Sequence, residues 1–175
     1  MFPCLLKQIE DSILLNPYDN DREEFVVNCL NNISYFKNVD KSTLRRLFYN
    51  VKYKFIQPDE YLFEALSLCT NIYILTYGIL DIVISNQNGV TKTLDCLGVN
   101  SIIGQQFILN NEKWPYSGFN KTTASIKVII ISHDVLKRFG FYHPEVREAM
   151  GEELDARNEE GFSQIDYIVK VDSIS

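Results

Sequence analysis

The stretch Asn71–Cys96, NIYILTYGILDIVISNQNGVTKTLDC, decides the fold of this chain. Gly78 ends an apolar run at residues 72–75, and beyond it Leu80, Ile82 and Ile84 alternate with other residues at the period of a half-buried strand. The NQNG that follows is typical of a hairpin turn, because Asn and Gly tolerate a positive φ. The stretch therefore predicts short antiparallel strands joined by tight turns.

Further short strands are predicted on either side of this stretch. Period-two spacing indicates strands at residues 51–55 and 61–63, separated by a proline turn, and one or two more within residues 122–131. Many short strands with regularly spaced turns are typical of rolls, sandwiches and barrels. We therefore predict an α+β fold whose centre, residues 50–131, is an antiparallel, jelly-roll-like β-roll of about eight short strands.

Helical patterns flank the predicted roll at both ends. Ser132 is a suitable N-cap for the helix that follows it, and Gly140 is a suitable stop for that helix. Apolar residues recur at intervals of three and four within residues 5–15, 25–33, 42–48, 133–139 and 144–158.

Length and composition indicate one globular unit with extensions. The chain has 175 residues, of which 46% are hydrophobic, enough for one core but not for two. We assign residues 1–18 to an N-terminal helical extension, residues 19–160 to the domain and residues 161–175 to a C-terminal tail.

Charge and hydropathy argue against several classes of partner. The formal net charge of −6 is unfavourable for binding nucleic acid, whose phosphates require a basic surface. No apolar run reaches the length of about 18 residues that a transmembrane helix needs, and the first residues lack the basic cluster of a signal peptide. The sequence thus predicts a cytoplasmic protein without direct membrane insertion.

The residue types that serve catalysis and metal binding are scattered along the chain. The four cysteines lie far apart and form no C-x-x-C pair, so we interpret them as buried free thiols. His133 and His143 are the only histidines, and both lie in or beside predicted helices, apart from any cluster of metal ligands. We therefore expect no metal site, no cofactor and no enzymatic activity.

Four segments resemble the cyclic nucleotide-binding domain family, which includes regulatory subunits of cyclic-AMP-dependent kinase and cytoplasmic gates of many channels. The resemblance spans residues 22–146 and implies the same β-roll. The leading helix of the family resembles REEFVVNCLNNISYFKNVDKSTLRRL (22–47), and its strand–Gly–strand hairpin resembles NIYILTYGILDIVI (71–84). The entry to its phosphate-binding cassette resembles LGVNSIIGQQFIL (97–109), and its last strands and following helix resemble KTTASIKVIIISHDVLKRF (121–139).

The resemblance breaks at the residues that hold the ligand in the family. The family cassette reads G-E-x-A-L and then, about nine residues after the Glu, R-[AT]-A. Its Arg pairs with the cyclic phosphate, and its Glu accepts from the ribose 2′-hydroxyl. Here Gly104 keeps the glycine, but Gln105 replaces the Glu and Tyr116 replaces the Arg, after a lengthened loop. We expect no cyclic nucleotide to bind at physiological levels to this degenerate cassette of Gly104, Gln105, Gln106, Phe107, Tyr116 and Ser117.

Other family glycines are also replaced. Asp59 stands where a glycine usually follows the proline turn, and Ala65-Leu66 and Asn100-Ser101 each replace a Gly-Asp pair. Asn can hold the left-handed conformation that such a position requires. The pattern of core residues is therefore retained while the pattern of ligand-binding residues is eroded.

The lengthened loop leaves two alternatives open. Lys113 and Lys121 lie nearby and are candidates to substitute for the missing cation. Trp114 and Tyr116 either fill the empty pocket as a hydrophobic plug or present an exposed aromatic anchor to a partner protein.

The C-terminal segments form a candidate docking surface. Residues 144–158 carry an apolar face among acidic residues, which either caps the roll of this chain or binds a basic or apolar partner. Phe162, Tyr167 and Ile168 extend that surface into the tail. We predict that residues 161–171 pack against another chain, because exposed apolar residues on a short tail are costly unless they are covered.

Two functions follow from these observations. The first is a non-catalytic interaction or regulatory subunit that has lost the usual ligand of the family and works with other protein subunits. By analogy with stand-alone and channel-linked members, its assembly would be ciliary (flagellar) or associated with a membrane channel. The alternative is a genuine cAMP or cGMP sensor with a rebuilt pocket. A basic side chain at the phosphate position would favour the sensor, and an apolar one the interaction module.

Overall fold

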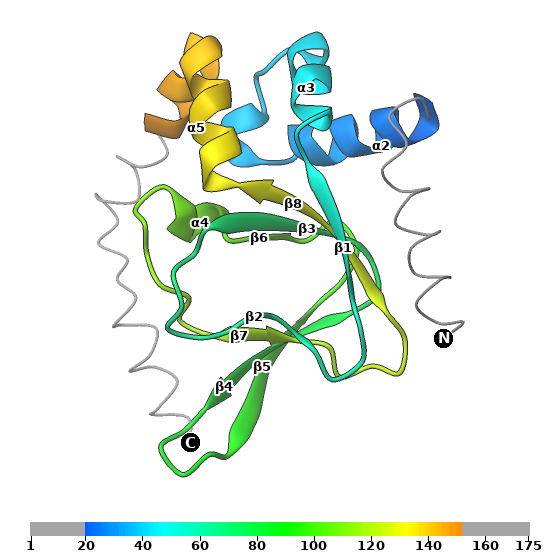
Figure 1. Ribbon diagram of the computed structural model, residues 1–175, viewed down its shortest axis with the longest axis vertical. Coiled ribbons are helices and arrows are strands. Elements are labelled where there is room, and N and C mark those ends of the chain that lie inside the picture. Colours follow the sequence, from blue (N-terminus) through cyan, green and yellow to red (C-terminus); the bar gives the residue numbers. More distant parts are fainter. Residues whose placement is uncertain (1–19, 152–175) are drawn as a thin grey trace.

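Two four-stranded antiparallel sheets form the centre of the computed structural model, which describes residues 20–151 (Figure 1). One sheet has the strand order β1-β8-β3-β6, and the other has the order β2-β7-β4-β5. This confirms the predicted eight-stranded antiparallel roll with helices before and after it. The strands are β1 Lys52–Ile56, β2 Tyr61–Phe63, β3 Asn71–Tyr77, β4 Leu80–Ser85, β5 Thr91–Leu97, β6 Ile102–Ile103, β7 Ser117–Phe119 and β8 Ile126–Ser132.

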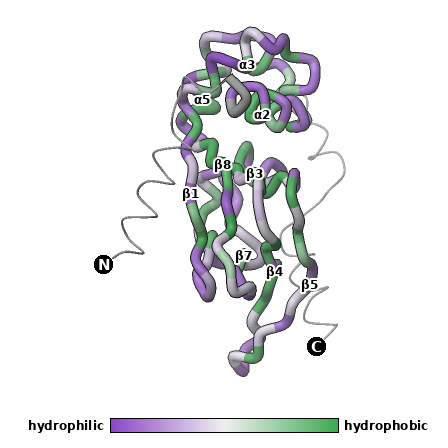
Figure 2. Tube along the Cα trace, turned by 90° about the vertical axis from the view of Figure 1, so that its right-hand side faces the viewer, coloured by the Kyte–Doolittle hydropathy of each residue, from purple (hydrophilic) through white to green (hydrophobic). Residues whose placement is uncertain are grey.

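The helices at the two ends of the described chain lie together on one side of the roll (Figures 1 and 2). As the sequence predicts, the side chain of Ser132 caps α5, because its Oγ accepts from the Val135 N–H at 3.2 Å. Residues 144–151 are helical as well. The helices are α2 Asn20–Asn31, the 3-10 helix η1 Ser34–Phe36, α3 Lys41–Phe48, α4 Gln105–Ile108 and α5 His133–Tyr142.

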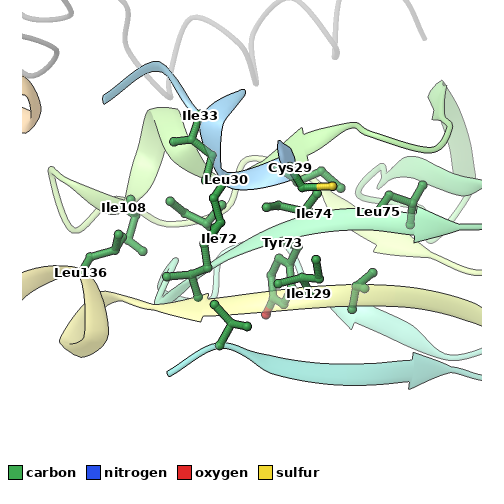
Figure 3. Close-up of a cluster of buried hydrophobic side chains, with 14 of the residues drawn as sticks. Cys29, Leu30, Ile33, Ile72, Tyr73, Ile74, Leu75, Ile108, Ile129 and Leu136 are labelled. Carbon is green, nitrogen blue, oxygen red and sulfur yellow. The ribbon is translucent and has the colours of Figure 1, made fainter. Parts of the chain in front are cut away.

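Mainly aliphatic side chains fill the layer between these helices and the sheet β1-β8-β3-β6 (Figure 3), together with the paired rings of Phe36 and Phe139. Alternation along β3 directs Ile72 and Ile74 toward this layer and Tyr73 away from it. Leu30 packs against these strand residues from the end of α2 and is fully buried. Burying one such side chain stabilises the fold by about 1.5–3 kcal/mol, so this layer holds the helices on the roll.

The segment between β7 and β8 is a turn, and the prediction of one or two strands within residues 122–131 is confirmed by a single strand, β8. The fully buried amide of Asn120 donates to the carbonyl oxygens of Ile56 and Ala124 at 2.9 and 2.8 Å. Its Oδ1 accepts from the Thr122 N–H at 2.9 Å. These bonds fix a corner in the chain, and β8 therefore begins only at Ile126.

The predicted stop of α5 at Gly140 is wrong. A Cβ atom at Gly140 would lie 2.7 Å from Met150 Cε, so this glycine gives residues 144–151 room to pack against α5. The helix ends at Tyr142 instead, because the residue before a proline avoids the helical region, and His143 has φ −128°. Val146 is fully buried against the core, so the described part of the C-terminal helix caps its own domain.

The three described cysteines are free thiols, but they are not all buried. Cys29 and Cys69 are buried as predicted. Cys96 is exposed on the edge strand β5, where its Sγ lies 3.4 Å from Asp81 Oδ1. The hydrogen bond to this carboxylate raises the pKa of Cys96.

Some predictions fall on residues outside the described range. They concern the extension at residues 1–18 and the tail residues Phe162, Tyr167 and Ile168. Within residues 20–151, no helix has the length and apolar character needed to cross a membrane.

Candidate functional site

The cassette begins at a glycine with left-handed backbone. Gly104 has φ 100°, a conformation that L side chains rarely adopt. Its carbonyl oxygen accepts from the N–H groups of Phe107 and Ile108 at 3.0 and 3.1 Å, which closes the single turn of α4. The cassette backbone thus has a short helix that starts at the expected glycine.

Five aromatic rings lie together inside the roll next to α4, and we call them the aromatic cluster. At its centre, the rings of Trp114 and Phe63 stack with their centroids 3.7 Å apart and their planes 14° apart. Trp114 is 2% exposed and Tyr116 is 9% exposed. The aromatic cluster consists of Phe63, Tyr73, Phe107, Trp114 and Tyr116.

Two glycines give the aromatic cluster its space. A Cβ atom at Gly104 would lie 2.8 Å from Cη2 of Trp114, so the indole fits directly against the first residue of the cassette. A Cβ atom at Gly118 would lie 2.8 Å from Cε1 of Phe63. The backbone at both ends of the cassette is therefore fitted to these rings, as in a close-packed core.

The position of Trp114 distinguishes between the two alternatives for the lengthened loop. An anchor for a partner would have to be exposed, whereas Trp114 lies in the interior against Phe63 and Gly104. The assignment of Trp114 as a partner-binding residue therefore does not match this structure. Its geometry and that of Tyr116 match the plug.

The side chain of Gln105 faces the N-terminal helices. Its Oε1 accepts from the backbone N–H and the hydroxyl of Ser34 at 3.4 and 3.2 Å, which connects the cassette to η1. Ser117 Oγ accepts from the Ala65 N–H at 2.8 Å. Gln106 is half-buried on α4. Gln105 thus forms a structural contact where the family resemblance implies a ribose ligand.

The two candidate substitute cations lie outside the aromatic cluster. Lys121 Nζ is 2.8 Å from Thr93 Oγ1 and 3.8 Å from Asp81 Oδ2. Asp81 alternates along β4 with Leu80 and Ile82, which belong to the core, so Lys121 lies on the outer face of that sheet. Lys113 is exposed. Lys121 therefore contacts Thr93 and Asp81, and substitution by either lysine for the missing cation stays a prediction.

Three residues at or beside the replaced family glycines have left-handed backbone. Asp59, Leu66 and Asn100 have φ of 63°, 69° and 72°. The expectation that Asn100 holds this conformation is confirmed. Leu66 has no polar side chain to support the conformation, and it is a strained position.

A comparison of the sequence with models of protein families assigns the chain to a family. Residues 53–140 match the family described as the cyclic nucleotide-binding domain. The chain belongs to this family. No curated protein matches it closely enough to count as a relative.

Solved structures of other cyclic nucleotide-binding-like domains share the fold. The N-terminal domain of a transcriptional regulator from Streptomyces coelicolor A3(2) is 17% identical, with a TM-score of 0.65 over 76% of this chain and 92% of that one. The regulatory subunit of a cAMP-independent protein kinase A from Trypanosoma brucei is 20% identical, with a TM-score of 0.53, over 75% of this chain and 52% of that one. The corresponding Trypanosoma cruzi subunit, bound to guanosine, is 15% identical with a TM-score of 0.59, over 88% and 50%. The chain spans about half the length of these kinase subunits.

The sequence did not indicate that Phe63 and Tyr73 belong to the site. Each lies on a strand in which successive residues are buried on both faces, so apolar spacing alone does not say which side chains point into the roll. The sequence also does not give the path of the loop that brings Trp114 onto Phe63, because irregular segments have no periodicity from which contacts can be derived.

Proposed function

We propose that this chain is a non-catalytic regulatory or interaction subunit whose pocket for a cyclic nucleotide is filled by its own aromatic cluster. The observation that carries this proposal is the burial of Trp114, which stacks on Phe63 and lies against the cassette glycine Gly104. In the family, the start of the cassette helix faces the cyclic phosphate. Here an indole is fitted against that glycine.

Binding a nucleotide would require the plug to leave. Re-exposing one large aromatic side chain of about 200 Å² costs about 5 kcal/mol at 25 cal/mol per Å². That cost alone weakens an affinity more than about a thousandfold. The five residues of the aromatic cluster are uncharged, so a phosphate that displaced Trp114 would gain no ion pair from them. The combined effect favours a domain that works without a cyclic nucleotide.

Similar solved structures support such a role. The regulatory subunit of a protein kinase A described as cAMP-independent has the same fold as this chain. A fold that does not respond to the family ligand still offers rigid surfaces to other protein subunits. The ciliary or channel-associated assembly stays a prediction from the family resemblance, and localisation of the tagged full chain would test it.

Calorimetric titration of the full chain with cAMP, cGMP and guanosine tests the loss of ligand binding. Guanosine is included because it is uncharged and so does not need the missing Arg. We expect no heat of binding for any of the three up to about 1 mM. A dissociation constant at or below about 10 μM for cAMP or cGMP would establish the alternative of a sensor with a rebuilt pocket.

A series of variants separates the plug from the missing ligands. Gln105→Glu with Tyr116→Arg restores the family residues but leaves the indole in place, so we expect no binding. Adding Trp114→Ala to these two changes should give measurable affinity for cAMP. Circular dichroism checks the fold of each variant. If the double variant binds as well as the triple variant, the plug is not the barrier.

A further inference from the structure

A groove of 440 Å³ lies between α3 and α5, and none of its lining residues belongs to the aromatic cluster. Leu47 of α3 and Val135 and Phe139 of α5 form its apolar floor. Leu47 and Phe139 are themselves buried in the core, so the floor is rigid. A volume of this size is typical of sites that take a small ligand or a few side chains.

Two arginines from opposite helices line the same groove. Arg46 of α3 and Arg138 of α5 are both exposed, and no acidic residue is part of the lining. Among residues 20–151, the neighbouring Arg45 pairs with Glu23 at 3.3 Å, but Arg46 and Arg138 form no ion pair. A chain with net charge −6 thus places two uncompensated positive charges over one apolar floor.

One exposed aromatic ring belongs to the groove itself. Tyr142 is part of the lining and is 74% exposed. Arg and Tyr are the residue types enriched at the energetic centres of protein–protein interfaces. The groove thus combines an apolar floor with side chains of the kind that such interfaces use.

We propose that the groove between α3 and α5 binds a peptide segment of a partner protein in which an acidic side chain stands next to an apolar one. The guanidinium groups of Arg46 and Arg138 match the geometry of a carboxylate, to which Arg donates two parallel hydrogen bonds. The floor of Leu47, Val135 and Phe139 receives the apolar side chain. Asn50 is also in the lining; its Nδ2 donates to the Arg46 carbonyl oxygen at 3.1 Å, and its Oδ1 offers an acceptor to the peptide backbone.

Charge complementarity favours a peptide over other anionic partners. Nucleic acid and anionic membranes bind through extended basic surfaces, whereas this groove offers two cations on an acidic chain. This inference deepens the interaction role proposed above and rests on it.

Selection from a random dodecapeptide display library on the immobilised full chain tests the proposal. We expect the enriched peptides to share an acidic residue beside an apolar one. Fluorescence polarisation then measures their affinity for the full chain and its variants. Arg46→Glu and Arg138→Glu should each weaken binding at least about tenfold, and raised salt should weaken the wild-type complex.

Lys137→Glu is the matched control. It makes the same charge change on the same helix, one residue from Arg138, but Lys137 does not line the groove. We expect it to change the affinity by less than about twofold. Circular dichroism of all three variants checks their fold, which should be unaffected because each side chain is exposed.

The other outcomes separate this inference from the proposed function. Peptides that bind all three variants as tightly as wild type would contradict the groove while leaving an interaction role in place. A library that yields no binder would contradict the peptide groove, whereas the calorimetric titration above tests the loss of ligand binding separately. The full chain could also self-associate in sedimentation experiments. If Arg138→Glu abolished that self-association, the groove would be the binding site for a second copy, and the proposal of a peptide ligand would be overturned.

Discussion

The two faces of the sheet β1-β8-β3-β6 are both buried, but different kinds of side chain cover them. The face toward the helices is mainly aliphatic, with Ile72 and Ile74 packed beneath Leu30. On the face toward the interior of the roll, Tyr73 lies among the rings of the aromatic cluster. On the face toward the helices, the packing joins helices to the sheet, which every member of this fold requires. Under the proposed function, these rings fill the pocket that the family resemblance assigns to the ligand, and the second face then carries what is particular to this chain.

Trp114→Ala should have the largest effect, because it empties the centre of the interior face. Truncating a buried aromatic side chain costs about 3–5 kcal/mol, so we expect the free energy of unfolding to fall by about 4 kcal/mol. A cavity lined by apolar rings can bind a small aromatic molecule. Indole at millimolar concentration should therefore raise the melting temperature of this variant. A variant that loses less than about 1 kcal/mol would show that the indole is not packed as described.

Leu30→Ala on the opposite face is the control for this experiment. It should cost about 3 kcal/mol, but indole should not restore its stability. Cysteine labelling distinguishes the two faces in the same samples, because burial raises the pKa of Cys69 to about 12 and raises that of Cys29. Cys69 Sγ lies 3.7 Å from the Gly104 carbonyl oxygen, so Trp114→Ala should speed labelling of Cys69 more than that of Cys29.

Gly104→Ala tests how tightly the indole fits the cassette. The new Cβ atom would lie 2.8 Å from Trp114 and 2.9 Å from the Asn71 carbonyl oxygen, at a residue with φ 100°. Strain and overpacking together should cost about 2–3 kcal/mol in urea unfolding. Gly98→Ala is the matched control, because a Cβ atom there meets nothing within 4 Å. Equal stabilities of the two variants would contradict the close fit.

Leu66→Gly should stabilise the protein. Left-handed backbone at a residue with φ 69° costs about 1–2 kcal/mol, and glycine removes that strain. Glycine also gives the unfolded chain more conformational entropy, which lowers the free energy of unfolding by about 0.5–1 kcal/mol. We expect a net gain of about 0.5–1 kcal/mol in the free energy of unfolding. Ala65→Gly is the control: it adds the same entropy to the unfolded chain but removes no backbone strain, so it should lower the free energy of unfolding. A loss of stability in both variants would show that the strain at Leu66 is absent.

The smallest effect is expected from His133, at the start of α5. Burial, followed by the charge of Lys137, lowers the pKa of this imidazole below its ordinary value of 6.5, although Asp134 acts in the opposite direction. As the pH falls, the unfolded chain therefore takes up this proton first, and the free energy of unfolding declines. His133→Gln should flatten that decline between about pH 7.5 and pH 5.5. An unchanged slope would contradict the lowered pKa.

The regular parts of this fold could be predicted from the sequence, but the corners could not. The spacing of apolar residues predicted β4 and α5 because side chains in strands and helices repeat with a fixed period. The spacing of apolar residues did not predict the turn at Asn120, because that turn depends on the hydrogen bonds of one buried side chain. Gly140 did not mark a helix end, because α5 continues to Tyr142 and this glycine instead faces the side chain of Met150.

The candidate site shows the same division. The loss of the family residues at Gln105 and Tyr116 could be read directly from the letters. The hydrogen-bond partner of Gln105 could not be predicted in this way, because Ser34 is distant in sequence and only folding brings its Oγ within 3.2 Å of Gln105 Oε1. Burial of Trp114 depends on the path of a loop without periodicity, so the sequence left plug and anchor as alternatives.

The chain contains one tryptophan, and it stands at the centre of the aromatic cluster. Its emission should be shifted to the blue, because an indole shielded from water has little solvent relaxation. Urea, an entering ligand or a displaced loop would each bring the indole into contact with water and move that emission to the red. Trp114 therefore gives the unlabelled protein an optical reporter of whether its pocket is open or closed.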